Sequence, residues 1–125
     1  QDGQRHMDYS TYPPTSGWYY NLDQEDMEWG ESSQTIDNEL QVSYLRYGGI
    51  LIQYNCPEDC PDLVENLKVI ASRYEEGVIL APYNTMSSTI SLTSWLWIDQ
   101  FEEFDEQRVD DFIQVHIGKG LIRMD

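Results

Sequence analysis

The sequence predicts a small α/β or α+β domain in which two helices cover a sheet of three to four strands. Three observations predict it: an apolar run at residues 49–54, helically spaced apolar residues just after it, and strict alternation over residues 90–98. The element order is β-α-β-β-α after an irregular N-terminal segment. With 125 residues, of which 40% are hydrophobic, the chain is expected to form one domain around a single modest core.

Residues 1–39 are predicted to be an irregular segment that packs on the domain, and residues 40–125 to be its α/β core. The block TYPPTSGWYY carries two consecutive prolines, which fix an extended backbone, and then a Thr-Ser-Gly turn. The acidic stretch 23–31 is expected to be an exposed loop.

The run at residues 49–54 (GILIQY) is predicted to be a central strand, because its three consecutive aliphatic residues leave no polar face. A helix follows from about Pro61, since proline fits the first turn and Asp62 suits the positive end of the helix dipole. Gly77 ends this element, and residues 78–81 form the next strand. The helix's expected buried face carries Leu63, Leu67, Ile70, Ala71 and Tyr74.

Alternation over residues 90–98 predicts one continuous strand, on which Trp95 and Trp97 share a face. Asp105 is a good N-cap for the last helix, and Gly118 terminates it. The apolar stripe of that helix is expected to contain Val109, Phe112, Ile113, His116 and Ile117.

The chain is strongly acidic, with 23 Asp and Glu against 7 Lys and Arg, for a formal net charge of −16. Phosphate binding needs a basic surface, so nucleic acid is not an expected partner. No apolar run reaches the roughly 18 residues of a membrane span. Three explanations of the acidity stay open: a solvated surface, a salt-rich habitat, or a docking face for a basic partner.

Cys56 and Cys60 are the only cysteines, and we interpret them as a structural disulfide of an oxidising compartment. A redox-active pair stays open as an alternative, because the strand-to-helix junction is similar to the place where thioredoxin-like folds hold their redox cysteines. Glu58 and Asp59 between the cysteines disfavour a thiolate.

No catalytic residue, cofactor site or metal site is predicted. His116 and His6 are the only histidines, and with Met86 they are the weak candidates for a soft copper-type site. A partly buried structural role is the favoured interpretation of His116. The aromatic residues divide between core and interface, and the interface candidates are Trp18, Tyr19, Tyr20, Trp29, Tyr47, Trp95 and Trp97.

Several blocks in order, YPPTSG at 12–17, LRYGGILIQYNCP at 45–57, GVILAPY at 77–83 and FDEQRVDDFIQVH at 104–116, resemble the bacterial and archaeal family named domain of unknown function 3105. The resemblance implies an exported or membrane-anchored domain. Relatives typically carry histidines after the PPTSG turn and in a block like V-H-x-L-E-H-G-G. Here Trp18, Ser43 and Tyr47 stand at those positions, and Arg46 replaces the glutamate, so a ligand set there is lost.

We therefore expect a non-enzymatic, extracytoplasmic accessory or structural subunit. It would dock on a membrane protein complex with basic loops, possibly an electron-transport assembly, and be held at the membrane by a partner or by a removed N-terminal anchor. The alternative is a redox or metal-handling periplasmic protein that uses the cysteine pair or the two histidines.

Overall fold

A computed structural model of the chain describes residues 13–15, 28–56, 60–74 and 76–120. These residues form a mixed α/β fold of five strands and three helices. In chain order the elements are β1 (Gly30–Glu31), α1 (Asn38–Arg46), β2 (Ile50–Tyr54), α2 (Pro61–Ala71), β3 (Val78–Pro82), β4 (Ile90–Ser94), β5 (Trp97–Phe101) and α3 (Glu106–His116).

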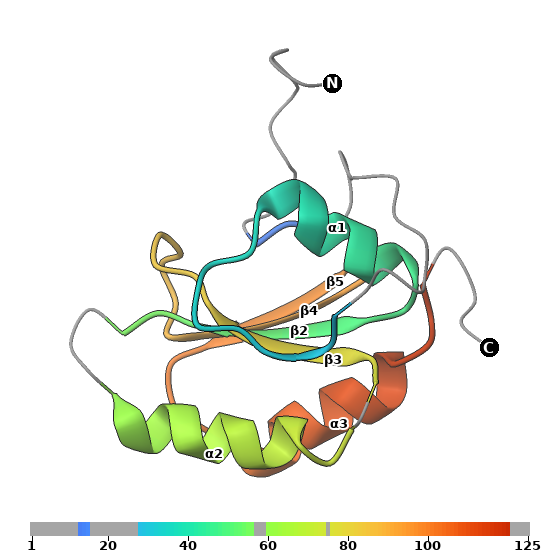
Figure 1. The fold of residues 1–125 in the computed structure, drawn as a ribbon. Helices are drawn as coiled ribbons and strands as arrows, with labels where there is room; N and C mark the ends of the chain where they lie inside the picture. The colour runs from blue at the N-terminus through green and yellow to red at the C-terminus, as the bar shows by residue number, and fades with distance from the viewer. Residues whose placement is uncertain (1–12, 16–27, 57–59, 75, 121–125) are drawn as a thin grey trace.

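The five strands form one sheet in the order β1-β3-β2-β4-β5. Strands β1, β3 and β2 are parallel, whereas β4 and β5 are antiparallel to their neighbours. The predicted central position of β2 is confirmed. Helix α1 covers one face of the sheet, and α2 and α3 cover the other (Figure 1). The sheet is therefore the middle of three layers.

The larger core lies between the sheet and the pair α2 and α3. Leu67 and Ile70 of α2 and Val109 and Ile113 of α3 are buried against it, as their helical spacing predicts. The strands contribute Ile50, Ile52, Val78, Leu80, Ile90, Leu92 and Phe101 to this core.

A second, smaller core lies under α1, which the sequence did not predict as a helix. The predicted boundary at residue 39 in fact falls inside α1. The reason is that α1 buries polar residues, Gln41 and Ser43, beside Val42 and Leu45, so its apolar spacing is weak. On the sheet, Leu51, Ile79 and Ala81 complete this core.

Strand β1 corrects the expectation of an acidic loop over residues 23–31. Gly30 pairs with Ile79 and Glu31 with Leu80, at the edge of the sheet. Both β1 residues are exposed, and two residues carry no alternation that sequence inspection could detect. Residues 23–27 lie outside the described part of the chain.

The single strand predicted for residues 90–98 is wrong, because the chain folds back in the middle of it. Ser94 pairs with Trp97, so Trp95 and Leu96 form a two-residue hairpin turn, with Leu96 at φ 71°. Non-glycine residues seldom adopt this left-handed backbone, so the turn carried no sequence signal. Trp95 and Trp97 consequently lie on opposite faces of the sheet: the first packs on the α1 side and the second against α3.

The two helical layers meet at one end of the sheet through two glycines. Gly48 follows α1 with φ 87°, and its carbonyl oxygen accepts a hydrogen bond of 2.8 Å from the Gly118 N–H. A Cβ atom on Gly48 would lie 2.7 Å from the Gly118 backbone. Gly118, which ends α3 as predicted, thus also closes the fold against the turn between α1 and β2.

Candidate protein-docking site

The most exposed large apolar side chains of the described residues cluster where β5 and α3 meet. Trp97 on β5 is 61% exposed, Leu96 in the preceding turn 62%, and Val115 on α3 54%. The ring centroids of Trp97 and His116 are 5.3 Å apart, and those of Phe112 and His116 4.5 Å apart. We call these five residues the Trp97 patch. Large apolar side chains gathered at a surface in this way mark interaction sites.

A shallow groove of about 480 Å³, largely open to solvent, adjoins the patch between β5 and α3. Phe112, Val115 and the His116 ring, which belong to the Trp97 patch, line one part of it. Its polar lining consists of Asp99, Asp105, Gln107, Arg108 and Asp111. The β5–α3 groove therefore joins an aromatic surface to several carboxylates.

Arg108 is the one cation in the groove lining, and its guanidinium is already bound by Asp99 of the same chain. Its Nε and Nη2 atoms donate to the two carboxylate oxygens of Asp99 at 2.8 and 2.7 Å. The guanidinium carbon also lies 4.1 Å from the centroid of the Phe101 ring. The hydrogen bonds to Asp99 raise the pKa of Arg108, so the side chain stays charged and fixed.

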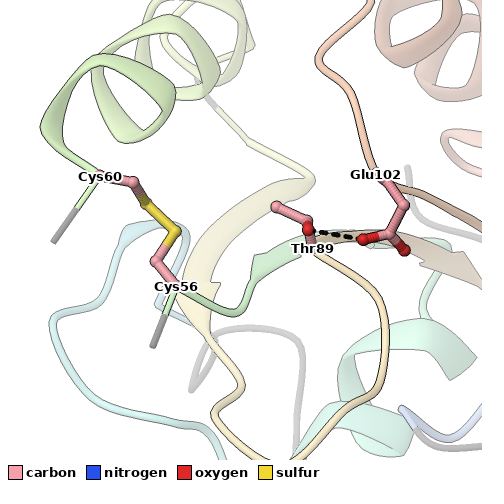
Figure 2. Close-up of a disulfide and its surroundings, with 4 residues drawn as sticks. All are labelled: Cys56, Cys60, Thr89 and Glu102. Atoms are coloured by element: carbon pink, nitrogen blue, oxygen red, sulfur yellow. Dashed lines mark hydrogen bonds between the residues drawn. A yellow bond between two sulfur atoms is a disulfide. The ribbon is translucent and has the colours of Figure 1, made fainter. Parts of the chain in front are cut away.

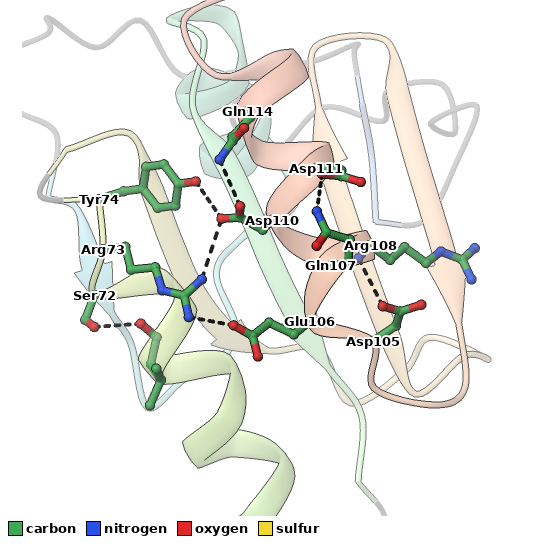
Figure 3. A network of polar contacts seen from close by, with 11 residues as sticks. Ser72, Arg73, Tyr74, Asp105, Glu106, Gln107, Arg108, Asp110, Asp111 and Gln114 are labelled. Carbon is green, nitrogen blue, oxygen red and sulfur yellow. Dashed lines mark hydrogen bonds and ion pairs between the residues drawn. The ribbon is translucent and has the colours of Figure 1, made fainter.

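The carboxylates of Asp105 and Asp111 belong to the local structure of α3. Asp105 is the N-cap, as predicted, and accepts a hydrogen bond of 3.2 Å from the Arg108 backbone N–H. Asp111 accepts one of 2.7 Å from Gln107 Nε2 (Figure 3). A carboxylate offers about four acceptor positions, so each side chain keeps acceptor capacity facing the groove.

A separate polar network fixes the opposite side of α3 to the turn that follows α2. Arg73 donates to Glu106 at 2.6 Å and forms an ion pair of 3.8 Å with Asp110 (Figure 3). Tyr74 donates to Asp110 at 2.8 Å, and burial, followed by this hydrogen bond, raises the pKa of the Tyr74 phenol. These contacts hold α3 in place while its groove side remains open to a partner.

His116 is partly buried on α3, beside Trp97 and Phe112. Burial lowers its pKa, with a smaller contribution from the nearby Lys119 charge, so the imidazole is neutral near pH 7. His116 is two residues before Gly118, which contacts Gly48 just before the start of β2. Met86 lies at the opposite end of this strand, where its carbonyl oxygen accepts a hydrogen bond from Asn55. The structure does not bring these two metal candidates together, and His6 lies outside the described residues. The described part of the chain holds no group of three or more potential ligands.

Cys56 and Cys60 form a disulfide, with their Cα atoms 6.1 Å apart (Figure 2). Cys56 follows β2 and Cys60 immediately precedes α2, so the bond links the end of the central strand to the start of a helix. Nearby, Thr89 Oγ1 donates to Glu102 at 2.8 Å. Glu58 and Asp59 lie outside the described residues.

The other interface candidates divide by burial. Trp29 is half-buried and packs edge-on against Tyr44 with ring centroids 5.1 Å apart, and Tyr47 and Trp95 pack against the α1-side core. Trp18, Tyr19 and Tyr20 lie outside the described residues. Trp97 is thus the described candidate with a predominantly exposed ring.

Sequence reasoning missed the neighbours of Trp97 in the patch. The alternation over residues 90–98 places Leu96 within a strand, and the apolar stripe of α3 does not include Val115. An apolar residue outside the buried face of a helix was an available signal. That α3 meets Trp97 here, through His116, depends on the hairpin turn, which the sequence did not indicate.

Within the described residues, the helices are too short and too polar for any of them to cross a bilayer.

Ser43, where the related motif has a histidine, is buried in α1 and donates to the Glu39 carbonyl at 3.0 Å. It therefore serves the helix backbone instead of a ligand site.

Comparison with known proteins gives one family match. The model of the family described as "Protein of unknown function (DUF3105)" matches residues 1–121. No curated protein and no solved structure matches the sequence. Since the match spans nearly the whole chain, the resemblance drawn from the sequence blocks is confirmed: this chain belongs to the DUF3105 family.

Proposed function

We propose that this chain is a non-enzymatic docking domain that works outside the cytoplasm as an accessory subunit of a membrane protein complex. The observation that carries the proposal is the exposure of three large apolar side chains of the Trp97 patch, those of Trp97, Leu96 and Val115. Burying a tryptophan and two aliphatic side chains at an interface supplies a typical energetic centre for protein recognition.

The net charge of −16 favours a partner whose docking loops are basic. Complementary charge speeds encounter and selects the partner, whereas the apolar patch provides the affinity. The disulfide favours an oxidising location, because such bonds form and persist outside the cytosol. In this proposal the partner holds the chain at the membrane, as expected of an accessory subunit. An electron-transport assembly is one candidate complex.

Gentle solubilisation of native membranes, separation of the complexes by size and mass spectrometry test the proposal. The chain is expected to migrate with a large assembly at fixed stoichiometry. Trp97→Ala should release it from that assembly. Val69→Ala is the matched control, since Val69 is an exposed apolar residue of α2 (48%) outside the Trp97 patch. Migration of the unsubstituted chain as a free species would refute the proposal.

A thiol–disulfide function is the second candidate, and the position of the cysteine pair favours it. Cys60 directly precedes α2, where the helix N-terminus would stabilise a thiolate. Mild reduction of the folded chain, followed by acid trapping and alkylation with a mass-tagged reagent, separates the candidates. A pair that stays oxidised during mild reduction supports the docking domain, and a pair that is readily reduced supports redox chemistry.

A further inference from the structure

We propose that the β5–α3 groove binds a short partner segment in which a lysine or arginine stands next to an aliphatic or aromatic residue. This inference rests on the proposed docking function and names the chemistry of the partner. Its evidence is the charge around the groove, the state of Arg108, and the apolar residues beside the carboxylates.

The first step concerns charge. Between Trp97 and His116 the chain has one cationic side chain, Arg108, and His116 is neutral near pH 7. The groove lining contains three carboxylates, those of Asp99, Asp105 and Asp111, against this one cation. Anionic partners are repelled from this surface, and a cationic segment is attracted to it.

The second step concerns which carboxylates are available. Asp99 is held by both nitrogen donors of Arg108, and Glu106 and Asp110 are held by Arg73. Asp105 and Asp111 accept hydrogen bonds from a backbone N–H and an amide, which are uncharged donors. Among the groove-lining carboxylates, Asp105 and Asp111 therefore offer a partner's cation the most favourable binding free energy.

The third step concerns the apolar part of the occupant. Phe112 and Val115 line the groove within the Trp97 patch, which continues to the exposed Trp97 ring. An aliphatic or aromatic side chain can cover these residues, and the stem of a lysine or arginine can pack on the indole while its charge reaches a carboxylate. A purely cationic segment would leave the patch exposed, so the occupant needs both kinds of residue.

A peptide titration followed by NMR tests the inference on the full, isotope-labelled chain. The probe is the synthetic peptide Gly-Lys-Leu-Arg-Phe-Lys-Gly, capped at both ends. Glutamine replaces each cation in a first comparison peptide, and glycine replaces Leu and Phe in a second. The signals to follow are the Trp97 indole N–H and the Val115 methyl groups.

The inference expects the probe to shift these signals and each comparison peptide to bind more weakly. Asp105→Asn with Asp111→Asn should raise the Kd about fivefold, by the loss of two surface ion pairs. Asparagine also caps helices well, so α3 should persist. The matched control, Asp62→Asn with Glu65→Gln on α2, removes the same charge and should change the Kd less than about twofold.

Equal weakening by the two double variants would overturn the inference, because binding would then follow net charge alone. So would a probe that shifts neither signal. Either result leaves the docking function standing if Trp97→Ala still releases the chain from its native assembly. If Trp97→Ala does not release the chain from its native assembly, the docking function itself is refuted.

Discussion

At the scale of single residues, Trp97 and Trp29 show how differently two tryptophans can serve one domain. We expect Trp97→Ala to lower the free energy of unfolding by less than about 1 kcal/mol, because its ring is mostly exposed. Trp29→Ala should cost about 2–3 kcal/mol, because its half-buried ring packs on Tyr44. Urea unfolding followed by circular dichroism measures both; equal costs would mean that Trp97 is a stabilising residue and not a docking one.

His116 makes stability depend on pH. Its pKa in the folded chain lies below the ordinary value of about 6.5, so the unfolded chain binds the proton more tightly. Its contribution to stability is therefore complete above the unfolded pKa and falls as the pH drops from about 7 toward the folded pKa. His116→Gln should flatten the stability profile over this range. A profile parallel to that of the unsubstituted chain would contradict the assignment.

Residue roles were predictable from the sequence where they depend on neighbours along the chain. The helix cap at Asp105 follows from its side-chain type, and the position of His116 beside Phe112 follows from helical spacing. The exposure of Trp97 does not, because it depends on which face of the sheet the residue reaches after the hairpin turn.

At the scale of the elements, the contact between Gly48 and Gly118 joins the two helical layers, and substitutions at these glycines test it. Gly48 and Gly118 both have positive φ, but only on Gly48 would a Cβ approach another backbone, at 2.7 Å. Gly118→Ala should cost about 1–2 kcal/mol from its backbone conformation. Gly48→Ala should cost more, because the backbone must also move. Thermal and urea unfolding of both variants measure the difference, and equal costs would contradict the close approach.

The disulfide between β2 and α2 closes a short loop, so its contribution should be modest. A sequence separation of four residues gives about 2 kcal/mol from the restricted unfolded chain. Replacing both Cys56 and Cys60 with serine should lower stability by that amount and leave the fold intact, as measured by urea unfolding. Complete unfolding of the variant would mean that the bond organises the whole sheet.

Elements were predictable where the apolar pattern is strong: continuous apolar runs mark β2 and β3, and helical spacing marks α2 and α3. Helix α1 could not be predicted because it buries glutamine and serine, which weakens its apolar spacing. Strand β1 could not be predicted because two residues show no pattern. The turn at Trp95 and Leu96 could not be predicted for another reason: it has no glycine, asparagine or proline, and the alternation continues through it.

At the scale of the whole molecule, the net charge of −16 should destabilise the folded chain by self-repulsion. Stability should therefore rise, on the order of 1 kcal/mol, between 10 mM and 0.5 M sodium chloride. The ion pairs of Lys68, Arg73 and Arg108 will weaken over the same range, but exposed pairs contribute little. Urea unfolding at each salt concentration is the measurement, and a fall in stability would mean that these pairs outweigh the repulsion.

The acidity of the molecule could be counted from the sequence, but its distribution could not. Arg73 binds across to α3 and Arg108 to β5, and these long-range pairs determine which carboxylates are left for a partner. Such choices follow from tertiary packing, which no local pattern encodes.

The contact between Gly48 and Gly118 has a consequence for folding kinetics. The β2-α2-β3 unit and the β4–β5 hairpin join neighbouring parts of the chain and can form early. The two glycines come from distant parts, and their contact needs both helical layers already in place. We expect it to form after the rate-limiting step. Weakening it should then speed unfolding and leave the folding rate almost unchanged, so this closure governs the lifetime of the folded molecule.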